Sequence, residues 1–285
     1  MHEIRGYRPA TALLGDSPAI RQVCAQLQRA ALVEVPVLIT GESGTGKELA
    51  ARLLHDLSGR RDHNFLKVNC PAISQNIFEV EMFGHQPGVQ ARTMTPGKCD
   101  QAHKGTLFLD EIGELDVALQ PKLLCALQDL RPAYLGALDD RLFDVRLIFA
   151  TSRNLEAEVI EGRFRSDLFY RINVLKIQMP SLRERSSDVP ILMKHFVAMY
   201  SDRFGTTPDP LRSSFVKLLQ SYHWPGNIRE LENLAKRYVV LGGEDHILSS
   251  LREPRELPSL PVEGIDLTTP LRVQTKRAIQ HLERD

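Results

Sequence analysis

A glycine-rich loop at residues 41–48, with the sequence GESGTGKE, is the feature that most constrains the fold of this chain. It follows the apolar run VPVLIT (residues 35–40) and precedes leucines at helical spacing, which are Leu49, Leu53, Leu54 and Leu57. Strand, glycine loop and amphipathic helix, in this order, are the context of a phosphate-binding loop, or P-loop. Backbone N–H groups of such a loop surround phosphate oxygens, and the lysine and the helix N-terminus attract the anion. We therefore expect a nucleotide site rather than an ordinary glycine turn.

The last residue of this loop departs from the usual pattern. The pattern G-x-x-x-x-G-K-[ST] ends in a hydroxyl residue that holds Mg²⁺, whereas this loop ends in Glu48. A carboxylate still favours the first turn of a helix, and it can approach Mg²⁺ directly or through water. We expect the change to alter metal coordination while the nucleotide site remains.

Five short apolar runs predict the strands of one sheet. They are VPVLIT (35–40), FLKV (65–68), TLFL (106–109), VRLIFAT (145–151) and VLKIQM (174–179). Several are nearly continuous rather than alternating, as expected of strands that are covered on both faces of a parallel sheet. Because helical patterns separate the runs, the sequence predicts an α/β layered domain.

Beyond Pro180 the strand pattern stops and helical patterns follow. One helix is expected to start at Ser187 or Asp188, and the apolar residues along it are Ile191, Leu192, Phe196 and Met199. The segments LRSSFVKLLQSYHW and GNIRELENLAKRYVVL are also helical in pattern, and a linker rich in proline and charge precedes a last helical piece, LRVQTKRAIQHLERD. We expect an α/β part at 1–182, a helical part at 183–253, and a linker with the start of a further region at 254–285.

Composition excludes several classes of protein. The 285 residues are 42% hydrophobic and 25% charged, as in a globular protein, and 36 basic residues balance 36 acidic ones. No global attraction to nucleic acid or membranes follows from this balance.

The four scattered cysteines favour reduced thiols over disulfides or a zinc site; they are Cys24, Cys70, Cys99 and Cys125. No apolar run approaches the roughly 18 residues of a membrane span, and no signal peptide is visible, so we expect a cytoplasmic location without membrane contact.

Two further patterns fit phosphoryl transfer. TLFLDEIGEL ends an apolar run in two carboxylates, of which Asp110 could orient Mg²⁺ and Glu111 could polarise a water for attack on the γ-phosphate. Alone, the pair would be a solvated acidic turn. EGRFRSDLFYRINV supplies arginines that could neutralise developing charge, but Arg165 and Arg171 lie roughly 240° apart on a continuous helix. Local sequence leaves surface charge as an equal alternative for these arginines.

Taken together, the motifs resemble the AAA+ ATPase domain of bacterial enhancer-binding proteins, the sigma-54-dependent transcriptional activators. The resemblance covers about residues 13–241, and it rests on GESGTGKELAARLLH, FLKVNCPAI, EMFGH, GTLFLDEIGEL, EGRFRSDLFYRINV, PSLRER and WPGNIRELEN. This family commonly carries glutamate after the loop lysine. The resemblance implies an AAA+ P-loop domain with a five-stranded parallel sheet, a small all-helical lid, and ATP and Mg²⁺ as cofactors.

The resemblance also implies the roles of single residues. Asp110 would coordinate Mg²⁺, with Glu48 as a second metal ligand. Glu111 would activate the attacking water, and Asn69 would restrain that glutamate. Ser152 stands at the sensor I position, and Arg165 and Arg171 would be the arginine fingers. The implied nucleotide-binding residues are Leu14 and Gly15 at the adenine, Gly41, Glu42, Ser43, Gly44, Thr45, Gly46, Lys47, Glu48 and Leu49 at the phosphates, and Arg229 as sensor II. For Trp224 and Pro225 we expect a helix junction packed into the core.

Two departures from the family pattern affect the expected function. Ser152 replaces the usual asparagine of sensor I, and a hydroxyl lacks the reach and paired donors of an amide, so hydrolysis is expected to be slowed or uncoupled. The loop that grips sigma-54 normally contains Gly-Ala-Phe-Thr-Gly-Ala, but residues 88–93 are GVQART. The aromatic anchor and the second glycine are lost there, so we expect little or no sigma-54 binding. Arg92 and Lys98 could instead contact nucleic acid or another partner.

Three functions are compatible with the sequence. The first is an ATPase that assembles with itself as a hexameric or heptameric ring, shares its catalytic sites between subunits, and remodels transcription machinery that includes RNA polymerase. The second is a regulator that uses ATP to control assembly, hydrolyses it weakly or not at all, and acts without sigma-54. A generic AAA+ chaperone or replication factor fits the motif set less well. The last helical piece resembles the opening of a DNA-binding domain, so we expect a part of a longer regulator that binds DNA through a region beyond this one.

Overall fold

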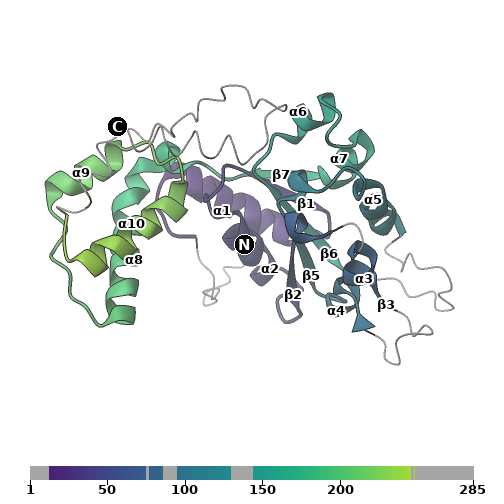
Figure 1. Ribbon diagram of the computed structural model, residues 1–285, viewed down its shortest axis with the longest axis horizontal. Helices are drawn as coiled ribbons and strands as arrows, with labels where there is room; N and C mark the ends of the chain where they lie inside the picture. Colours follow the sequence, from purple (N-terminus) through teal and green to yellow (C-terminus); the bar gives the residue numbers. More distant parts are fainter. Residues whose placement is uncertain (1–12, 75–76, 86–94, 130–143, 245–246, 248–285) are drawn as a thin grey trace, which may run out of the picture. The chain divides into compact units, whose positions relative to one another are not determined.

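A computed structural model describes residues 13–74, 77–85, 95–129, 144–244 and 247 (Figure 1). Its main sheet has five parallel strands in the order β2-β5-β6-β1-β7. The strands are β1 (Val37–Thr40), β2 (Phe65–Asn69), β5 (Thr106–Asp110), β6 (Arg146–Thr151) and β7 (Leu175–Gln178). The predicted five-stranded parallel sheet is therefore confirmed.

The strand limits differ slightly from the predicted ones for a clear reason in β1. The strand begins at Val37 and not at Val35, because Pro36 has no N–H to donate to a neighbouring strand. Its first three residues, Val37, Leu38 and Ile39, are almost completely buried, as the continuous apolar run predicted. Leu38 packs in the core on one face of the sheet, while Val37 and Ile39 pack in the core on the other.

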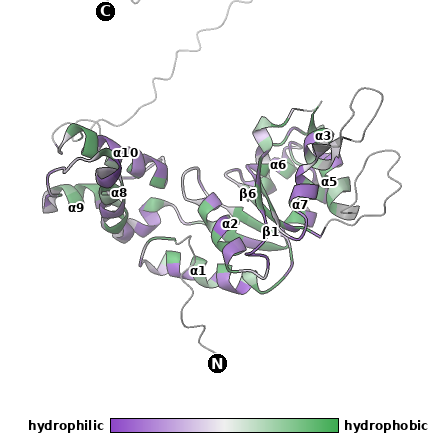
Figure 2. Ribbon diagram, turned by 90° about the horizontal axis from the view of Figure 1, so that it is seen from below, coloured by the Kyte–Doolittle hydropathy of each residue, from purple (hydrophilic) through white to green (hydrophobic). Residues whose placement is uncertain are grey.

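Helices cover both faces of this sheet (Figure 1). The α-helices of this part are α1 (Pro18–Ala31), α2 (Lys47–Asp56), α3 (Phe78–Phe83), α4 (Lys98–Gln101), α5 (Gln120–Asp129), α6 (Leu155–Ile160) and α7 (Ser166–Ile172). Two short 3-10 turns, η1 (Cys70–Ala72) and η2 (Ile112–Glu114), and a small antiparallel pair, β3 (Gly84–His85) with β4 (Thr95–Pro96), complete it. Figure 2 shows hydrophilic and hydrophobic residues along α1, whose apolar side packs in the same core as β1 and α2.

The chain after β7 is helical, as predicted. It contains η3 (Leu182–Asp188), α8 (Val189–Phe204), α9 (Ser213–Ser221) and α10 (Asn227–Leu241). The expected start of α8 is correct, because Asp188 directly precedes it. Its apolar pattern was less accurate: Leu192 is buried, but Ile191 and Met199 are exposed.

The expected core position at the junction of α9 and α10 is correct for Trp224 but wrong for Pro225, which is exposed. The side chain of Trp224 is completely buried, and its indole N–H donates to the Leu219 carbonyl oxygen at 2.8 Å. The four cysteines are free thiols. Within the described ranges, no helix has the length and apolar character needed to cross a membrane. The predicted linker and last helix lie beyond Ile247, in a separate unit outside the described residues.

Candidate active site

The glycine loop connects the end of β1 to the start of α2, as the sequence predicted. Gly46 caps α2 with φ 98°, and Gly44 has φ 78°. A side chain at Gly44 would place its Cβ 2.4 Å from the Gly226 carbonyl oxygen, so only glycine fits there. The loop is therefore shaped both by its own turns and by the start of α10, which packs on it.

Lys47 is nearly buried at the first position of α2, with 6% of its surface exposed. Its Nζ donates to the carbonyl oxygens of Gly41 at 2.9 Å and Glu42 at 3.3 Å, and it lies 3.2 Å from Oε1 of Glu111. The ammonium is thus held between the loop backbone and the predicted catalytic carboxylate. This position suits a group that binds terminal phosphates.

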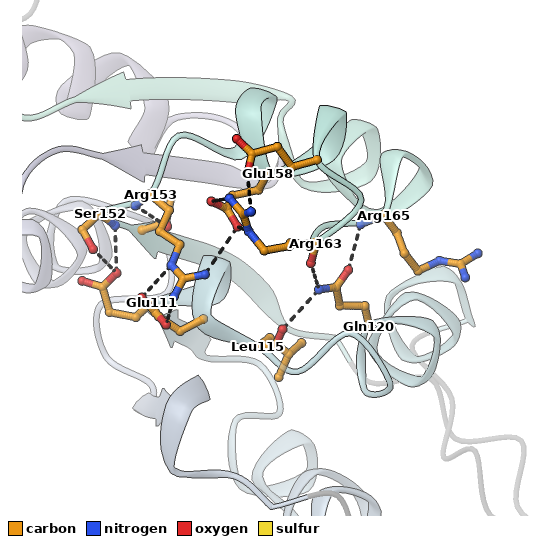
Figure 3. A network of polar contacts seen from close by, with 11 residues as sticks. Glu111, Leu115, Gln120, Ser152, Arg153, Glu158, Arg163 and Arg165 are labelled. Atoms are coloured by element: carbon orange, nitrogen blue, oxygen red, sulfur yellow. Dashed lines mark hydrogen bonds and ion pairs between the residues drawn. The ribbon is translucent and has the colours of Figure 1, made fainter. Parts of the chain in front are cut away.

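Glu111 follows β5 with an unusual backbone conformation, φ 53° and ψ 51°. Such conformations cost energy in residues other than glycine and occur often at functional sites. Oε2 accepts hydrogen bonds from both the backbone N–H and the hydroxyl of Ser152, each at 2.8 Å (Figure 3). Burial raises the pKa of Glu111, but the bonds from Ser152 and the charge of Lys47 outweigh it, so that the net pKa lies below its ordinary value.

Asn69 does not make the contact that its implied role requires. It ends β2 directly beside Asp110 in the sheet register, and it is exposed. The hydrogen bonds to the Glu111 carboxylate come from Ser152 instead, and none comes from Asn69 within the described residues. The switch role of Asn69 stays a prediction.

The two expected metal ligands, Glu48 and Asp110, lie on either side of one ammonium group. Lys67 Nζ is 2.6 Å from Oε2 of Glu48 and 2.8 Å from Oδ2 of Asp110. Mg²⁺ in nucleotide sites is usually held by one or two carboxylates together with phosphate oxygens. Two carboxylates that converge on a single cation fit this requirement, and they could hold Mg²⁺ with a bound nucleotide.

Burial lowers the pKa of the Lys67 ammonium, but its hydrogen bonds to Asp110 and Glu48 outweigh that effect and raise the pKa above its ordinary value. Lys67 therefore carries its charge at neutral pH. The sequence did not predict a role for Lys67, because a lysine in the middle of a strand has the same sequence pattern whether it is simply solvated or contacts a functional group. Only its distance to two carboxylates, from α2 and β5, distinguishes it.

The two expected arginine fingers lie at the two ends of α7. Arg165 caps the helix and pairs with Asp167 at 2.7 Å, while Arg171 donates to the Leu127 carbonyl oxygen at 3.1 Å. Figure 3 shows the Arg165 side chain extending away from Glu111. Neither arginine contacts the glycine loop within the described residues.

Gln120 fixes the backbone next to Arg165 and was not expected from the sequence. Its side chain is completely buried. Its Nε2 donates to the carbonyl oxygens of Leu115 and Arg163, at 3.1 and 2.9 Å, and its Oε1 accepts from the Arg165 N–H at 2.8 Å (Figure 3). One amide thus ties the start of α5 to the loop that carries the arginine.

A chain of ion pairs begins beside Ser152 and runs toward the loop at residues 161–165, which carries Arg163 and Arg165. Arg153, the next residue, pairs with Glu114 and lies 3.4 Å from Glu158 Oε2. Glu158 also accepts from Arg163 at 2.7 Å. In Figure 3 the side chains of Arg153, Glu158 and Arg163 connect the residue after Ser152 to the loop at residues 161–165.

The expected sensor II arginine contacts the glycine loop. Arg229, near the start of α10, donates from Nη1 to the Ser43 hydroxyl at 2.9 Å. The side chain of Glu42 turns toward the helical part, where it pairs with Arg183 and accepts from Asn227 Nδ2 at 3.1 Å. Hydrogen bonds and ion pairs lower the pKa of Glu42, first through Arg183 and then through Asn227.

Asn227 is a third residue that sequence reasoning missed. It is completely buried with φ 52°, and its Oδ1 accepts from the Leu182 N–H at 2.8 Å. Its Nδ2 donates to both Glu42 and the Ser43 carbonyl oxygen. One side chain therefore joins η3, α10 and the glycine loop.

The remaining predicted residues are placed as follows. Gly15 packs against the Asp188 carboxylate, which accepts hydrogen bonds from Asp16 and Ser17, and Leu14 beside it is half-buried. Thr45 donates its hydroxyl to the Glu42 carbonyl oxygen at 2.8 Å, and Leu49 is exposed on α2. The GVQART segment, residues 88–93, lies outside the described residues.

Comparison with known families agrees with this arrangement. Residues 13–178 match the model of the Sigma-54 interaction domain, and residues 183–257 match that of the AAA+ ATPase lid domain. The chain belongs to the sigma-54 interaction domain family. It is accordingly an AAA+ ATPase domain of the type found in sigma-54-dependent transcriptional activators, and its fold is the α/β AAA+ fold with a helical lid.

Two curated members of the sigma-54 interaction domain family are similar over most of this chain. The sigma54-dependent transcriptional activator SfnR of Pseudomonas putida is 43% identical over 265 residues, which are 90% of this chain and 72% of SfnR. The regulatory protein AtoC of Escherichia coli is 40% identical over 281 residues, which are 95% of this chain and 61% of AtoC.

Solved structures of NtrX from Brucella abortus are also similar. The structure of NtrX in complex with ATP is 33% identical, has a TM-score of 0.76, and is matched over 96% of this chain and 62% of NtrX. NtrX has also been solved in complex with ADP. This sigma-54 interaction domain therefore spans under two thirds of both AtoC and NtrX.

Proposed function

We propose that this chain binds ATP with Mg²⁺ and hydrolyses it at sites shared between neighbouring copies in a ring. One observation carries the proposal: Lys47, from the glycine loop, lies 3.2 Å from Glu111, which follows β5. A phosphate-binding cation and a general base from separate elements are thereby brought to one place. In this proposal the part at residues 1–182 supplies these groups, and the part at residues 183–253 acts as the lid.

The side chains divide the chemistry in the following way. Backbone N–H groups of residues 41–47 and the Lys47 ammonium hold the phosphates, and Arg229 reaches the same loop from the lid. Glu111 orients the attacking water and accepts its proton. Bound Mg²⁺, held by Asp110 with Glu48, would neutralise charge on the phosphate oxygens. Leu14 and Gly15 lie at the adenine in this proposal.

The placement of Arg165 and Arg171 supports shared sites. Phosphoryl transfer gains strongly from an arginine that approaches the transferred group, either from the same chain or from a partner. Arg165 contacts Asp167, and Arg171 contacts the Leu127 carbonyl oxygen. Within the described residues, neither arginine contacts the glycine loop. We infer that they serve the site of a second copy of this chain.

Mixing two inactive variants tests the proposal. Glu111→Gln and Arg165→Ala should each lower hydrolysis by about a thousandfold and leave ATP binding intact. A mixture in equal amounts should recover up to roughly a quarter of the native rate, since about one interface in four combines a native Glu111 with a native Arg165.

The matched control for Arg165→Ala is Arg29→Ala, which removes an exposed arginine on α1 and should hydrolyse ATP at the native rate. Phosphate release would be followed, and mass measurement with a non-hydrolysable ATP analogue would count the copies. A mixture as inactive as its components, or native monomers as active as the assembly, would overturn the shared site.

A second candidate function is a regulator that binds ATP, hydrolyses it weakly and acts without sigma-54. Two observations favour it: the residues GVQART at the position of the sigma-54 contact loop, and the double hydrogen bond that Ser152 makes to Glu111. In this case the partner would be RNA polymerase in another form, with DNA bound through a further region. Transcription assays with and without sigma-54 distinguish the two, because strong sigma-54-dependent initiation would exclude the second.

A further inference from the structure

Lys67 lies on β2 with its side chain on the face of the sheet that α2 covers. Phe65, two residues earlier, points to the same face, where the Arg52 guanidinium of α2 lies 4.6 Å from the centre of its ring. Alternate residues of a strand share a face, so Lys67 is directed toward α2 as well. Glu48 is one helical turn before Arg52, which brings it within reach of Lys67.

The ammonium of Lys67 contacts two carboxylates from different elements. It is 2.6 Å from Glu48 in the first turn of α2 and 2.8 Å from Asp110 at the end of β5. Lys47, the other cation of the site, pairs with Glu111 and the loop carbonyls instead. The positive charge between Glu48 and Asp110 therefore comes from Lys67 alone within the described part of the chain.

We propose that the Lys67 ammonium occupies the position between Glu48 and Asp110 where Mg²⁺ would bind. It competes with Mg²⁺ for these two carboxylates. It thereby sets how strongly nucleotide binding depends on the metal. The inference rests on the nucleotide site proposed above. It assigns Lys67 a positioning and specificity role, without direct participation in the reaction.

Simple electrostatics gives the two consequences of this arrangement. Two uncompensated carboxylates next to the phosphates would repel a nucleotide, and the Lys67 charge offsets part of that repulsion. The same charge repels a divalent cation that binds to these two carboxylates, so metal binding should weaken the ion pairs of Lys67 with Glu48 and Asp110. The native chain should thus tolerate metal-free nucleotide better, and bind Mg²⁺ less tightly, than a chain without this lysine.

Calorimetric titration of ADP into the full chain tests the proposal, first with a chelator and then over a series of Mg²⁺ concentrations at constant ionic strength. Mg²⁺ changes the affinity for ADP, and half of this change occurs at a certain Mg²⁺ concentration. In Lys67→Met this concentration should fall about three- to tenfold, the size expected for loss of partly exposed ion pairs. ADP binding without metal should weaken in the same variant. The same ADP additions and the same Mg²⁺ concentrations are used for every variant, so that chelation of Mg²⁺ by free ADP is equal in each comparison between variants.

Two controls separate charge from structure. Lys67→Arg keeps the charge and should retain the native Mg²⁺ dependence. Lys176 lies on β7, at the opposite edge of the sheet, and pairs with Glu156 at 2.8 Å. Lys176→Met removes this lysine and should also retain the native Mg²⁺ dependence. Circular dichroism confirms that each variant is folded.

Identical Mg²⁺ titrations for the native chain and Lys67→Met would overturn the inference and leave the nucleotide site in place. The same holds if Lys67→Arg behaves as Lys67→Met, since charge would then not be the cause. If the native chain bound no ADP with or without Mg²⁺, the proposed nucleotide site and this inference would both be wrong.

Discussion

The carboxylate of Glu111 accepts two hydrogen bonds from a single residue, Ser152, and both reach the same oxygen, Oε2. The other oxygen lies 3.2 Å from the Lys47 ammonium. Both oxygens of the proposed general base are therefore engaged. A carboxylate held in this way is a weaker base than a free one, because hydrogen bonds to the charged form lower its pKa.

Ser152→Ala should make Glu111 a stronger base. The change removes the hydroxyl donor but leaves the backbone N–H, so the pKa of Glu111 should rise toward its ordinary value. Because the base must be ionised to act, the acidic limb of the pH–rate profile of ATP hydrolysis should move to higher pH. Ser221→Ala, which removes an exposed hydroxyl at the end of α9, is the control and should leave the profile unchanged. An unchanged limb in Ser152→Ala would show that Ser152 does not tune this carboxylate.

Gln120→Ala should lower the free energy of unfolding by about 2–4 kcal/mol, because it leaves one buried backbone group, of Leu115, and two part-buried ones, of Arg163 and Arg165, without their hydrogen bonds. If the amide positions the Arg165 loop, hydrolysis by the folded variant should fall more than tenfold while its ADP affinity stays native. Urea denaturation and ADP titration measure the two effects. Gln101→Ala, which changes an exposed glutamine at the end of α4, serves as control. Native hydrolysis by a destabilised Gln120→Ala would limit this residue to a structural role.

Asn227 should respond differently to three substitutions. Asn227→Gly accepts φ 52° without strain but loses the side-chain bonds to Leu182, Glu42 and Ser43, which should cost about 2–4 kcal/mol. Asn227→Asp keeps the acceptor for Leu182 but faces the Glu42 carboxylate with a like charge, so it should be less stable than Asn227→Gly.

Asn227→Ala adds backbone strain and should lie below Asn227→Gly in stability. Thermal unfolding of the three variants gives the order. If Asn227→Asp were as stable as the native chain, the contact with Glu42 would contribute nothing measurable.

His55 should make the fold sensitive to mild acid. Its ring is buried against Phe65 with Nδ1 2.9 Å from the Thr106 hydroxyl, and burial lowers its pKa, more than the nearby Asp56 raises it. The unfolded chain therefore takes up a proton at higher pH than the folded one, and stability falls as the pH drops below about 6.5. The melting temperature should fall between pH 7.5 and 5.5, and it should fall less in His55→Gln. His195→Gln, on the exposed side of α8, should behave as the native chain. Equal acid sensitivity in His55→Gln would assign the effect to other groups.

The sequence by itself determined the parts of this protein that depend on contiguous residues. The buried runs at 37–40 and 106–110 specify strands because a parallel sheet covered on both faces demands apolar side chains on both sides. The glycine loop is specified because its turns need residues that tolerate positive φ. The order of such local signals also sufficed to identify the family.

Only the tertiary structure decided which polar groups meet. Ser152 and Glu111 are separated by 41 positions, and Asn227 and Glu42 by 185, so no local pattern relates them. Lys67 and Gln120 look in the sequence like a solvated lysine and a helix-start glutamine. Their roles follow from the packing of β2 on α2 and of α5 on the arginine loop, because hydrogen bonds and ion pairs form within about 3 Å and are decided by the final position of each chain segment.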